Sequence, residues 1–202
     1  MTRRIFRLVF LVLLLSGSLV TASAAEQRAV FAGGCFWGVE GVFEHVKGVI
    51  DVRSGYAGGS KATASYSDVS SGETTHAESV EIRFDPAKVT YEQLLNIFFF
   101  VVHDPTEVDR QGPDEGPQYR SVVFYLNANQ KRSADTFIAN MEKAKIFERP
   151  VATKVAPFVE FFPAEDYHQD FMKKNPDHPY VVAHDLRKLD ALKQKFPEQY
   201  RK

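Results

Sequence analysis

The stretch ESVEIRFD, residues 78–85, constrains the fold more than any other part of this 202-residue chain, because its side chains alternate between apolar and polar. An extended strand places Glu78, Val80, Ile82 and Phe84 on one face. Such a strand covers a core with its apolar face, so the carboxyl group of Glu78 is predicted to face the core. Loss of hydration there would raise its pKa. The alternative is a strand-end glutamate that pairs with a lysine or arginine.

The rest of the chain predicts strands interleaved with helices. Residues 57–75 and 106–118 are typical of polar loops. The pattern predicts an α+β fold, a two-layer α/β sandwich around one mixed, mainly antiparallel sheet and related to ferredoxin-like folds. The sequence leaves the strand order open. Further strands are expected over residues 28–32, 49–56, 120–126 and within 153–162, and helices over 36–46, 90–102, 129–145, 164–173 and 185–196.

Residues 1–24 predict a secretory signal peptide. Arg3, Arg4 and Arg7 precede an apolar run over residues 8–15, and Ala22-Ser23-Ala24 is the small-residue pattern of a cleavage site. The run is far shorter than the ~20 residues that span a bilayer. We therefore expect an exported, periplasmic protein with a single domain over residues 25–202. The general and the twin-arginine export routes both stay open.

The charge of the chain argues against nucleic acid as a partner. The formal net charge is -1, and removal of the leader's three arginines would leave 22 basic against 26 acidic side chains. The sequence contains no basic run of the kind that contacts phosphates. We therefore expect no nucleic-acid binding.

The only cysteine of the chain, Cys35, lies in the stretch GGCFWGVE. Exported proteins commonly use cysteines in pairs, so an odd cysteine indicates a free thiol or an intermolecular bond. The glycines allow a ligand to approach the backbone, and the predicted helix start at Phe36 would lower the thiol pKa from ~8.5. Phe36 and Trp37 add aromatic surface. A structural cysteine is the alternative, but this combination favours an accessible nucleophile.

The histidines leave two other functions open. A cysteine hydrolase or acyl transferase would combine Cys35 with His76 and an acid such as Asp68. A non-catalytic module would bind methionine-rich or oxidised peptides through Phe36 and Trp37. His168, His178 and His184 lie in polar contexts typical of solvated side chains. The six histidines lack the paired spacing of metal ligands, so no metal is expected.

Four blocks of this sequence closely resemble the A-type peptide methionine sulfoxide reductases. They are GGCFWGVE, YSDVSSGETTHAESVEIRFDP, HDPTEVDRQGPDEGPQYRS and FFPAEDYHQDF, and the resemblance runs from about residue 30 to about residue 180. It implies an oxidoreductase that reduces methionine (S)-sulfoxide, free or in proteins, and so repairs oxidative damage. It implies no cofactor and no metal, and the expected state is a monomer.

The resemblance also implies a role for seven residues. Cys35 matches the nucleophile and Glu78 the acid that protonates the sulfoxide oxygen. Tyr66 and Tyr119 match phenols that hydrogen-bond this oxygen, Asp114 matches an acidic residue of the same site, and Phe36 and Trp37 match the apolar wall for the substrate methyl group. The other tyrosines are interpreted as structural. These are Tyr56, Tyr91, Tyr125, Tyr167, Tyr180 and Tyr200.

Many relatives carry downstream cysteines that this chain lacks. The resemblance therefore implies a single-cysteine form of the enzyme, in which the Cys35 sulfenic acid reacts with an external thiol. A thioredoxin-like or glutaredoxin-like protein or a small thiol would serve as this reductant.

Overall fold

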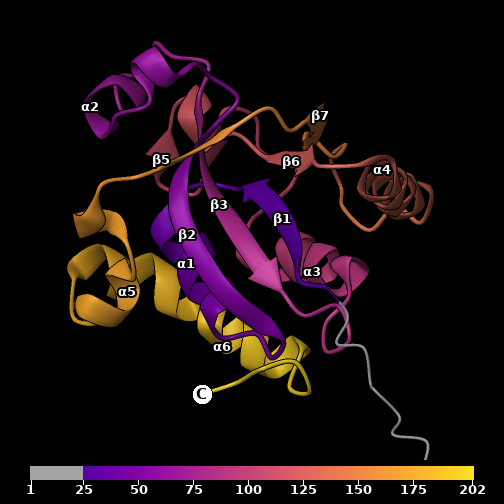
Figure 1. Ribbon diagram of the computed structural model, residues 1–202. Coiled ribbons are helices and arrows are strands. Elements are labelled where there is room, and N and C mark those ends of the chain that lie inside the picture. The colour runs from indigo at the N-terminus through magenta and orange to yellow at the C-terminus, as the bar shows by residue number, and fades with distance from the viewer. Residues whose placement is uncertain (1–24) are drawn as a thin grey trace, which may run out of the picture.

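Six strands form one sheet in the computed structural model, which describes residues 25–202 (Figure 1). The predicted signal peptide, residues 1–24, lies outside the described residues. Four strands and two helices follow one another as βαββαβ, and the strands pair in the order β6-β1-β3-β2, which is a ferredoxin-like arrangement. These elements are β1 (Gln27–Ala32), α1 (Phe36–Glu44), β2 (Val49–Ala57), β3 (Ala77–Phe84), α3 (Tyr91–Ile97) and β6 (Val122–Tyr125).

Two short strands extend this sheet at its edges. β7 (Lys154–Pro157) pairs parallel to β6, and β8 (Phe161–Pro163) pairs antiparallel to β2. The other neighbouring strands are antiparallel, and the full order is β7-β6-β1-β3-β2-β8. The predicted α+β fold with a mixed, mainly antiparallel sheet is confirmed.

One face of the sheet packs against helices. Figure 1 shows α1 and α6 (Leu186–Lys195) behind β2 and β3. Val80, Ile82 and Phe84 of β3 are fully buried in the core between these layers. Phe43 of α1 belongs to the same cluster. The alternation of residues 78–85 therefore predicted correctly which face of β3 turns to the core.

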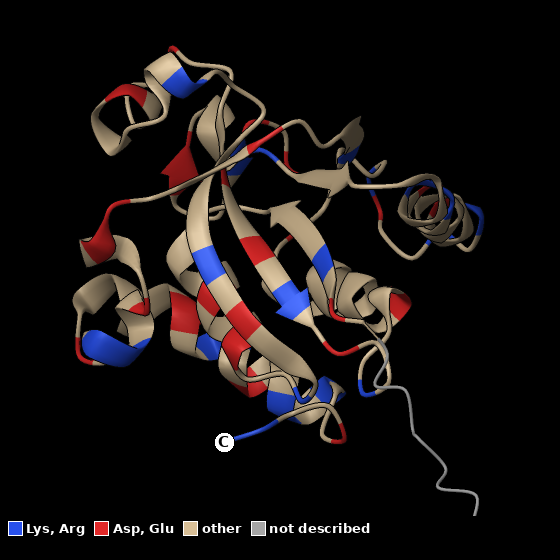
Figure 2. Cartoon of the chain, in the orientation of Figure 1, with Lys and Arg blue, Asp and Glu red and all other residues tan. Residues whose placement is uncertain are grey.

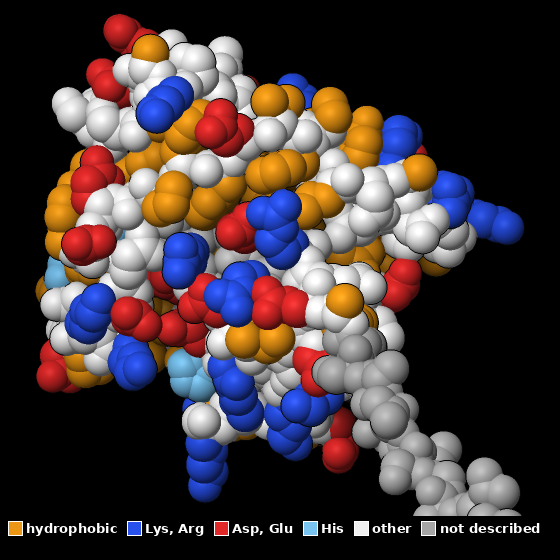
Figure 3. All heavy atoms as spheres, viewed as in Figure 1, with side chains coloured by type: hydrophobic (Ala, Val, Ile, Leu, Met, Phe, Trp, Pro, Cys, Tyr) orange, Lys and Arg blue, Asp and Glu red, His pale blue; other side chains and the backbone are white. Residues whose placement is uncertain are grey.

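The opposite face of the sheet is divided between an apolar and a charged part. The segment that contains β7 and β8 crosses one part, where Phe158 and Phe161 pack on a second apolar cluster with Val30. The other part carries ion pairs, among them Arg28 with Glu81 at 2.9 Å. Figures 2 and 3 show basic and acidic side chains interleaved over this region.

The remaining elements are short, except for α4 (Ala128–Lys143). The predicted loop over residues 57–75 contains η1 (Lys61–Thr63) and α2 (Tyr66–Val69), and the loop over 106–118 contains a hairpin of β4 (Arg110–Gln111) and β5 (Asp114–Glu115), followed by η3 (Pro117–Tyr119). A π-helical turn, η2 (Phe98–Val102), completes α3. Within residues 25–202, no helix combines the length and apolar character needed to cross a bilayer.

The predicted helix over residues 164–173 is wrong. The chain forms a 3-10 turn, η4 (Asp166–His168), and a single helical turn, α5 (Phe171–Lys174). Asp170 between them is left-handed with a φ of 52°. The side chain of Gln169 instead exchanges hydrogen bonds with the Ser54 backbone at 2.9 and 3.0 Å, which ties the segment to β2. Helical periodicity in this segment is overridden by that long-range contact.

Glu40 is a buried carboxyl on the sheet-facing side of α1. It is 1% exposed and accepts a hydrogen bond from the Ser54 backbone N–H at 3.3 Å. Burial, followed by the charges of Glu44 and Asp170, raises the pKa of Glu40 to about 7. Its proton therefore stabilises the fold, and this stabilisation is lost as the pH rises through about 7.

We expect Glu40→Gln to stabilise the protein at about pH 8 by roughly 1–3 kcal/mol and to have little effect at about pH 5. Glutamine keeps the acceptor for Ser54 and cannot ionise. Urea unfolding at both pH values measures the difference. Glu142→Gln on the exposed side of α4 is the matched control. Equal effects of Glu40→Gln at the two pH values would contradict the assigned ionisation.

Candidate active site

Cys35 lies where β1 ends and α1 begins. Gly34 makes the turn between them with a φ of 92°, and Cys35 is the N-cap residue of α1. Phe31 of β1 is paired with Val80 of β3, and Ala32 with Val122 of β6, so the starts of β3 and β6 lie at this same end of the sheet. Figure 1 shows α2 and β5 at this end as well. Cys35 exposes 8% of its surface.

Glu78 is held beside Cys35 by a hydrogen bond across the two layers. The backbone N–H of Phe36, the first residue of α1, donates to Glu78 Oε2 at 3.0 Å. Glu78 itself is 2% exposed. Burial raises the pKa of Glu78 to about 8, against the lowering effect of the Phe36 N–H, and the charge of Asp114 adds to the rise. At neutral pH the carboxyl group therefore carries its proton.

The other predicted polar residues surround this pair. Tyr66 begins α2, Asp114 begins β5 and Tyr119 ends η3. The pKa values of both phenols are raised by burial first, and then by the charges of Glu78, Cys35 and Asp114. Contacts agree with this: η3 lies against β3, and the rings of Tyr66 and Phe36 both lie against His168. Asp114 is bonded to Tyr180, whose ring lies edge-on to Trp37, so the five groups share one site. The structure thus brings the predicted polar residues together, while their catalytic roles remain predictions.

Phe36 and Trp37 form an aromatic wall next to the sulfur. The Trp37 indole is stacked on Phe171 of α5, with ring centroids 3.6 Å apart and an interplanar angle of 5°. Its Nε1–H donates to His168 Nδ1 at 3.0 Å. The His168 ring also lies 5.0 Å from the Phe36 ring and 4.5 Å from the Tyr66 ring, measured between centroids. His168 therefore contacts both the aromatic wall and a phenol.

The prediction of a solvated His168 is wrong, since this side chain is 1% exposed. Sequence analysis also missed two other residues of the site. Glu165 accepts hydrogen bonds from the Tyr56 hydroxyl at 2.8 Å and from the Tyr66 backbone N–H at 2.9 Å. Tyr180, interpreted as structural, donates its hydroxyl to Asp114. These contacts join segments far apart in the sequence, so no local periodicity could have indicated them.

The arrangement required by the hydrolase alternative is not formed. His76 Nε2 lies 2.9 Å from the Ser60 carbonyl oxygen, and its ring packs edge-on against Phe162. Asp68 accepts a hydrogen bond from the Ser65 hydroxyl at 2.7 Å on the exposed α2. The His76 ring is thus hydrogen-bonded to the Ser60 carbonyl, and the Asp68 carboxylate is hydrogen-bonded to Ser65, the N-cap residue of α2.

The expected lowering of the Cys35 pKa is also wrong for the substrate-free protein. Burial, followed by the negative charges of Glu78 and Asp185, raises the pKa of the Cys35 thiol well above its usual range. The Trp37 backbone N–H and the Lys188 ammonium act in the opposite direction and do not overcome these effects. The helix start does provide an N–H group, but the thiol keeps its proton at neutral pH.

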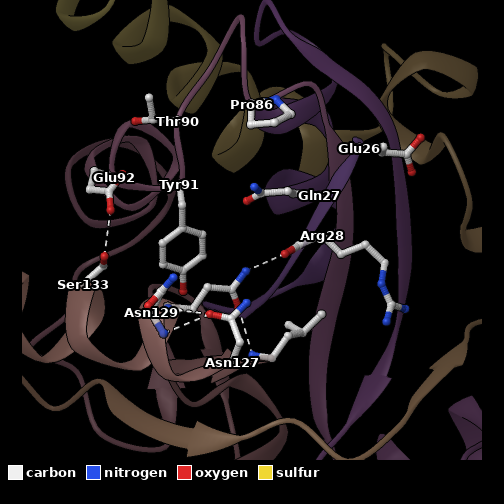
Figure 4. A pocket seen from close by; sticks show the side chains of 12 residues that line it. Glu26, Gln27, Arg28, Pro86, Thr90, Tyr91, Glu92, Asn127, Asn129 and Ser133 are labelled. Carbon is white, nitrogen blue, oxygen red and sulfur yellow. Dashed lines mark hydrogen bonds between the residues drawn. The ribbon is translucent and has the colours of Figure 1, made fainter. Parts of the chain in front are cut away.

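A polar hollow lies at the opposite end of the sheet (Figure 4). Its volume is about 550 Å³, and it is formed by the start of β1, the start of α3 and the start of α4. Several polar side chains here bond with one another or with the backbone, as when Ser133 donates to Glu92 at 2.7 Å and Gln130 to the Arg28 carbonyl at 2.6 Å. The hollow contains neither a thiol nor a buried acid, unlike the site at Cys35.

The chain matches known proteins along most of its length. The family model described as "Peptide methionine sulfoxide reductase" matches residues 27–200. The chain belongs to this family. It is 53% identical to peptide methionine sulfoxide reductase MsrA 2 of Synechocystis over 179 residues, which cover 89% of this chain and 84% of that protein. It is 42% identical to MsrA of Deinococcus radiodurans, over 88% and 86% of the two chains.

Solved structures agree with this assignment. Mxr1 of Saccharomyces cerevisiae in its reduced form matches with a TM-score of 0.69 and 30% identity, over 76% of this chain and 87% of that chain. Methionine sulfoxide reductase A of Corynebacterium diphtheriae matches with a TM-score of 0.65 and 31% identity, over 75% and 76%. The chain is thus an A-type peptide methionine sulfoxide reductase, an oxidoreductase that reduces methionine sulfoxide. In residues 25–202, no three His, Cys, Asp or Glu side chains are grouped as metal ligands.

We expect the Glu78 carboxyl carbon to titrate with a midpoint of about 8 in the substrate-free protein. The carboxyl is protonated below this pH and ionised above it, because burial disfavours the charge. Carbon NMR of labelled glutamate in a Cys35→Ser background reports the midpoint without thiol ionisation. Glu78→Gln in the same background identifies the signal by its loss. A midpoint in the ordinary glutamate range would contradict the dry environment assigned to Glu78.

Proposed function

We propose that the chain reduces the S epimer of methionine sulfoxide, with Cys35 as the nucleophile and Glu78 as the acid. The observation that carries this proposal is the placement of a protonated carboxyl beside a buried thiol, fixed by the 3.0 Å hydrogen bond from the Phe36 N–H. Phe36 and Trp37 form the surface for the substrate methyl group. The substrate is methionine sulfoxide, either free or exposed in oxidised proteins.

The first step transfers the sulfoxide oxygen to Cys35. The Cys35 sulfur attacks the sulfoxide sulfur while the proton of Glu78 moves to the oxygen, and the thiol proton replaces it on Glu78. The S–O bond of the substrate and the newly formed S–S bond then both break as the hydroxyl group passes to Cys35. The products are methionine, whose sulfur gains two electrons, and the Cys35 sulfenic acid, whose sulfur loses two. Glu78 ends the step protonated, as it began.

Charge on the sulfoxide oxygen is the main electrostatic demand of this step. The oxygen becomes more basic as the new sulfur bond forms, and Glu78 supplies the proton that neutralises it. The hydroxyl groups of Tyr66 and Tyr119 would donate hydrogen bonds to it, since both phenols keep their protons at neutral pH. Asp114, bonded to Tyr180, closes the polar side of the site. Donors placed in advance in a dry site are worth a large part of the rate enhancement.

The second step requires thiols from outside the chain. Cys35 is the only cysteine, so no intramolecular disulfide can form. An external thiol attacks the sulfenic acid, releasing water and leaving a mixed disulfide on Cys35, and a second external thiol frees Cys35 and carries away the disulfide. A thioredoxin-like or glutaredoxin-like dithiol supplies both thiols in one molecule, whereas a small thiol supplies them in two encounters.

Single-turnover experiments without reductant test the first step. We expect one methionine per protein molecule and a mass increase of one oxygen atom on Cys35, because the sulfenic acid has no internal partner. Cys35→Ser should form no methionine, and Glu78→Gln should form it about a hundredfold or more slowly. Mass spectrometry and amino-acid analysis follow both products. An unmodified thiol beside reduced methionine would refute the proposed nucleophile.

We also propose that the protein is exported to the periplasm with removal of residues 1–24. The support is the order of arginines, apolar run and small residues in this segment. We expect the periplasmic fraction of expressing cells to contain a chain that begins at Ala25 or Glu26. Replacing both Ala24 and Ala25 by leucine should block the cleavage, because signal peptidase requires a small residue immediately before the cleaved bond. N-terminal sequencing checks both, and a full-length chain in the cytoplasm would contradict export.

A further inference from the structure

A buried ion pair lies behind the first turn of α1. Asp185 ends the π-helical turn η5 (Val181–Asp185), and Lys188 lies in the first turn of α6. Their closest atoms, Asp185 Oδ1 and Lys188 Nζ, are 3.2 Å apart. The Asp185 side chain is fully buried and that of Lys188 is 18% exposed. Burying such a pair opposes folding through desolvation, so its presence calls for a function.

The pair lies against Gly38, three residues beyond Cys35. A Cβ atom added to Gly38 would lie 2.1 Å from Asp185 Oδ1 and 2.6 Å from Lys188 Nζ. Gly38 therefore leaves the space that the two charged groups occupy. Residues three apart on a helix are neighbours, so the pair lies within about one helical turn of Cys35. Apart from the ion pair with Lys188, neither carboxylate oxygen of Asp185 has a polar partner within residues 25–202.

The charges of this pair act on the sulfur in opposite directions. Asp185 raises the pKa of Cys35, after burial and Glu78, and Lys188 lowers it. Lys188 is the positive group among the charged side chains that act on the thiol. The titratable groups that face Cys35 from the other elements are Glu78 of β3, Tyr66 of α2, Asp114 of β5, Tyr119 of η3 and Tyr180, which precedes η5.

We propose that Asp185 and Lys188 are positioning residues for Cys35: Asp185 holds the Lys188 ammonium behind the first turn of α1, and the ammonium compensates negative charge on the sulfur. This inference rests on the proposed role of Cys35 as the nucleophile. As Cys35 gives up its proton during attack, the sulfur needs a nearby positive charge, since the carboxyl groups of Glu78 and Asp185 disfavour its anionic form. Asp185 keeps the flexible lysine from turning to solvent.

The test measures the thiol pKa of three variants. The two methods are the ultraviolet absorbance of the thiolate and the pH dependence of alkylation with iodoacetamide. With a single cysteine, both signals come from Cys35 alone. We expect Lys188→Met to raise the thiol pKa and to slow alkylation at fixed pH roughly tenfold, the effect of about one pKa unit. Asparagine keeps an oxygen that can accept a hydrogen bond from the Lys188 ammonium but removes the negative charge, so Asp185→Asn should lower the pKa and accelerate alkylation. Lys188→Arg keeps the charge and should restore near-normal values.

Matched controls come from the same helix. Asp190 and Lys193 form an exposed pair with the same spacing, at 3.2 Å. We expect Asp190→Asn and Lys193→Met to leave the thiol pKa unchanged. A purely structural role for the buried pair would lower the melting temperature of both of its variants without moving the thiol pKa in opposite directions. An unchanged pKa in Lys188→Met, or shifts of the same sign in both variants, would overturn the proposal.

These measurements use no sulfoxide, so they remain informative whether or not Cys35 is the nucleophile. Full activity of Cys35→Ser would refute the proposed function and leave the thiol pKa result standing. In the reaction itself, we expect Lys188→Met to slow the single-turnover formation of methionine at neutral pH, where Glu78 is still protonated, and Lys188→Arg to keep the rate near normal. Equal losses in the two variants would count against the positioning role.

Discussion

The hydrogen bond from the Phe36 N–H to Glu78 is the contact on which the active site depends. It joins the first turn of α1 to the second residue of β3, two positions 42 residues apart. The N–H groups of a helix's first turn have no partner within the helix, and here one of them fixes a carboxyl beside Cys35, the proposed nucleophile. The same bond favours the ionised carboxyl, yet burial outweighs it and keeps Glu78 protonated. A single contact therefore sets the position of the acid, while the surrounding core sets its protonation.

The aromatic side of the site is fixed by His168 in a comparable way. Its Nδ1 atom accepts the hydrogen bond of the Trp37 indole, while its ring packs against Phe36 and Tyr66. Phe171, three residues further on, stacks on Trp37. The left-handed Asp170 allows both side chains to reach the indole from one short segment. The break in the predicted helix over residues 164–173 is thus what brings this segment to the site.

Local patterns predicted the parts of the structure that depend on a single element. The alternation of β3 was enough to predict that Glu78 faces the core. The helix predicted from residue 90 begins there, where Thr90 and Gln93 form the capping box of α3. The site residues Tyr66, Asp114 and Tyr119 were identified from the family resemblance alone, because they lie in polar segments without periodicity. The sequence did not predict the roles of His168, Glu165 and Tyr180, because their contacts join residues that are 66 to 131 positions apart. Such pairings are set by the strand order, which the sequence left open.

The protonation of Cys35 shows why a helix start does not by itself make a reactive thiolate. The favourable effect of a helix N-terminus on a nearby negative charge is typically about 0.3–1 kcal/mol. Desolvation of a fully buried group can shift a pKa by several units, each worth about 1.4 kcal/mol. In this site the sulfur is almost fully buried and lies near two carboxyl groups, so the larger effects win. In the proposed mechanism, Cys35 therefore keeps its proton until a sulfoxide accepts the proton of Glu78. The carboxylate that remains can then take the proton of the thiol.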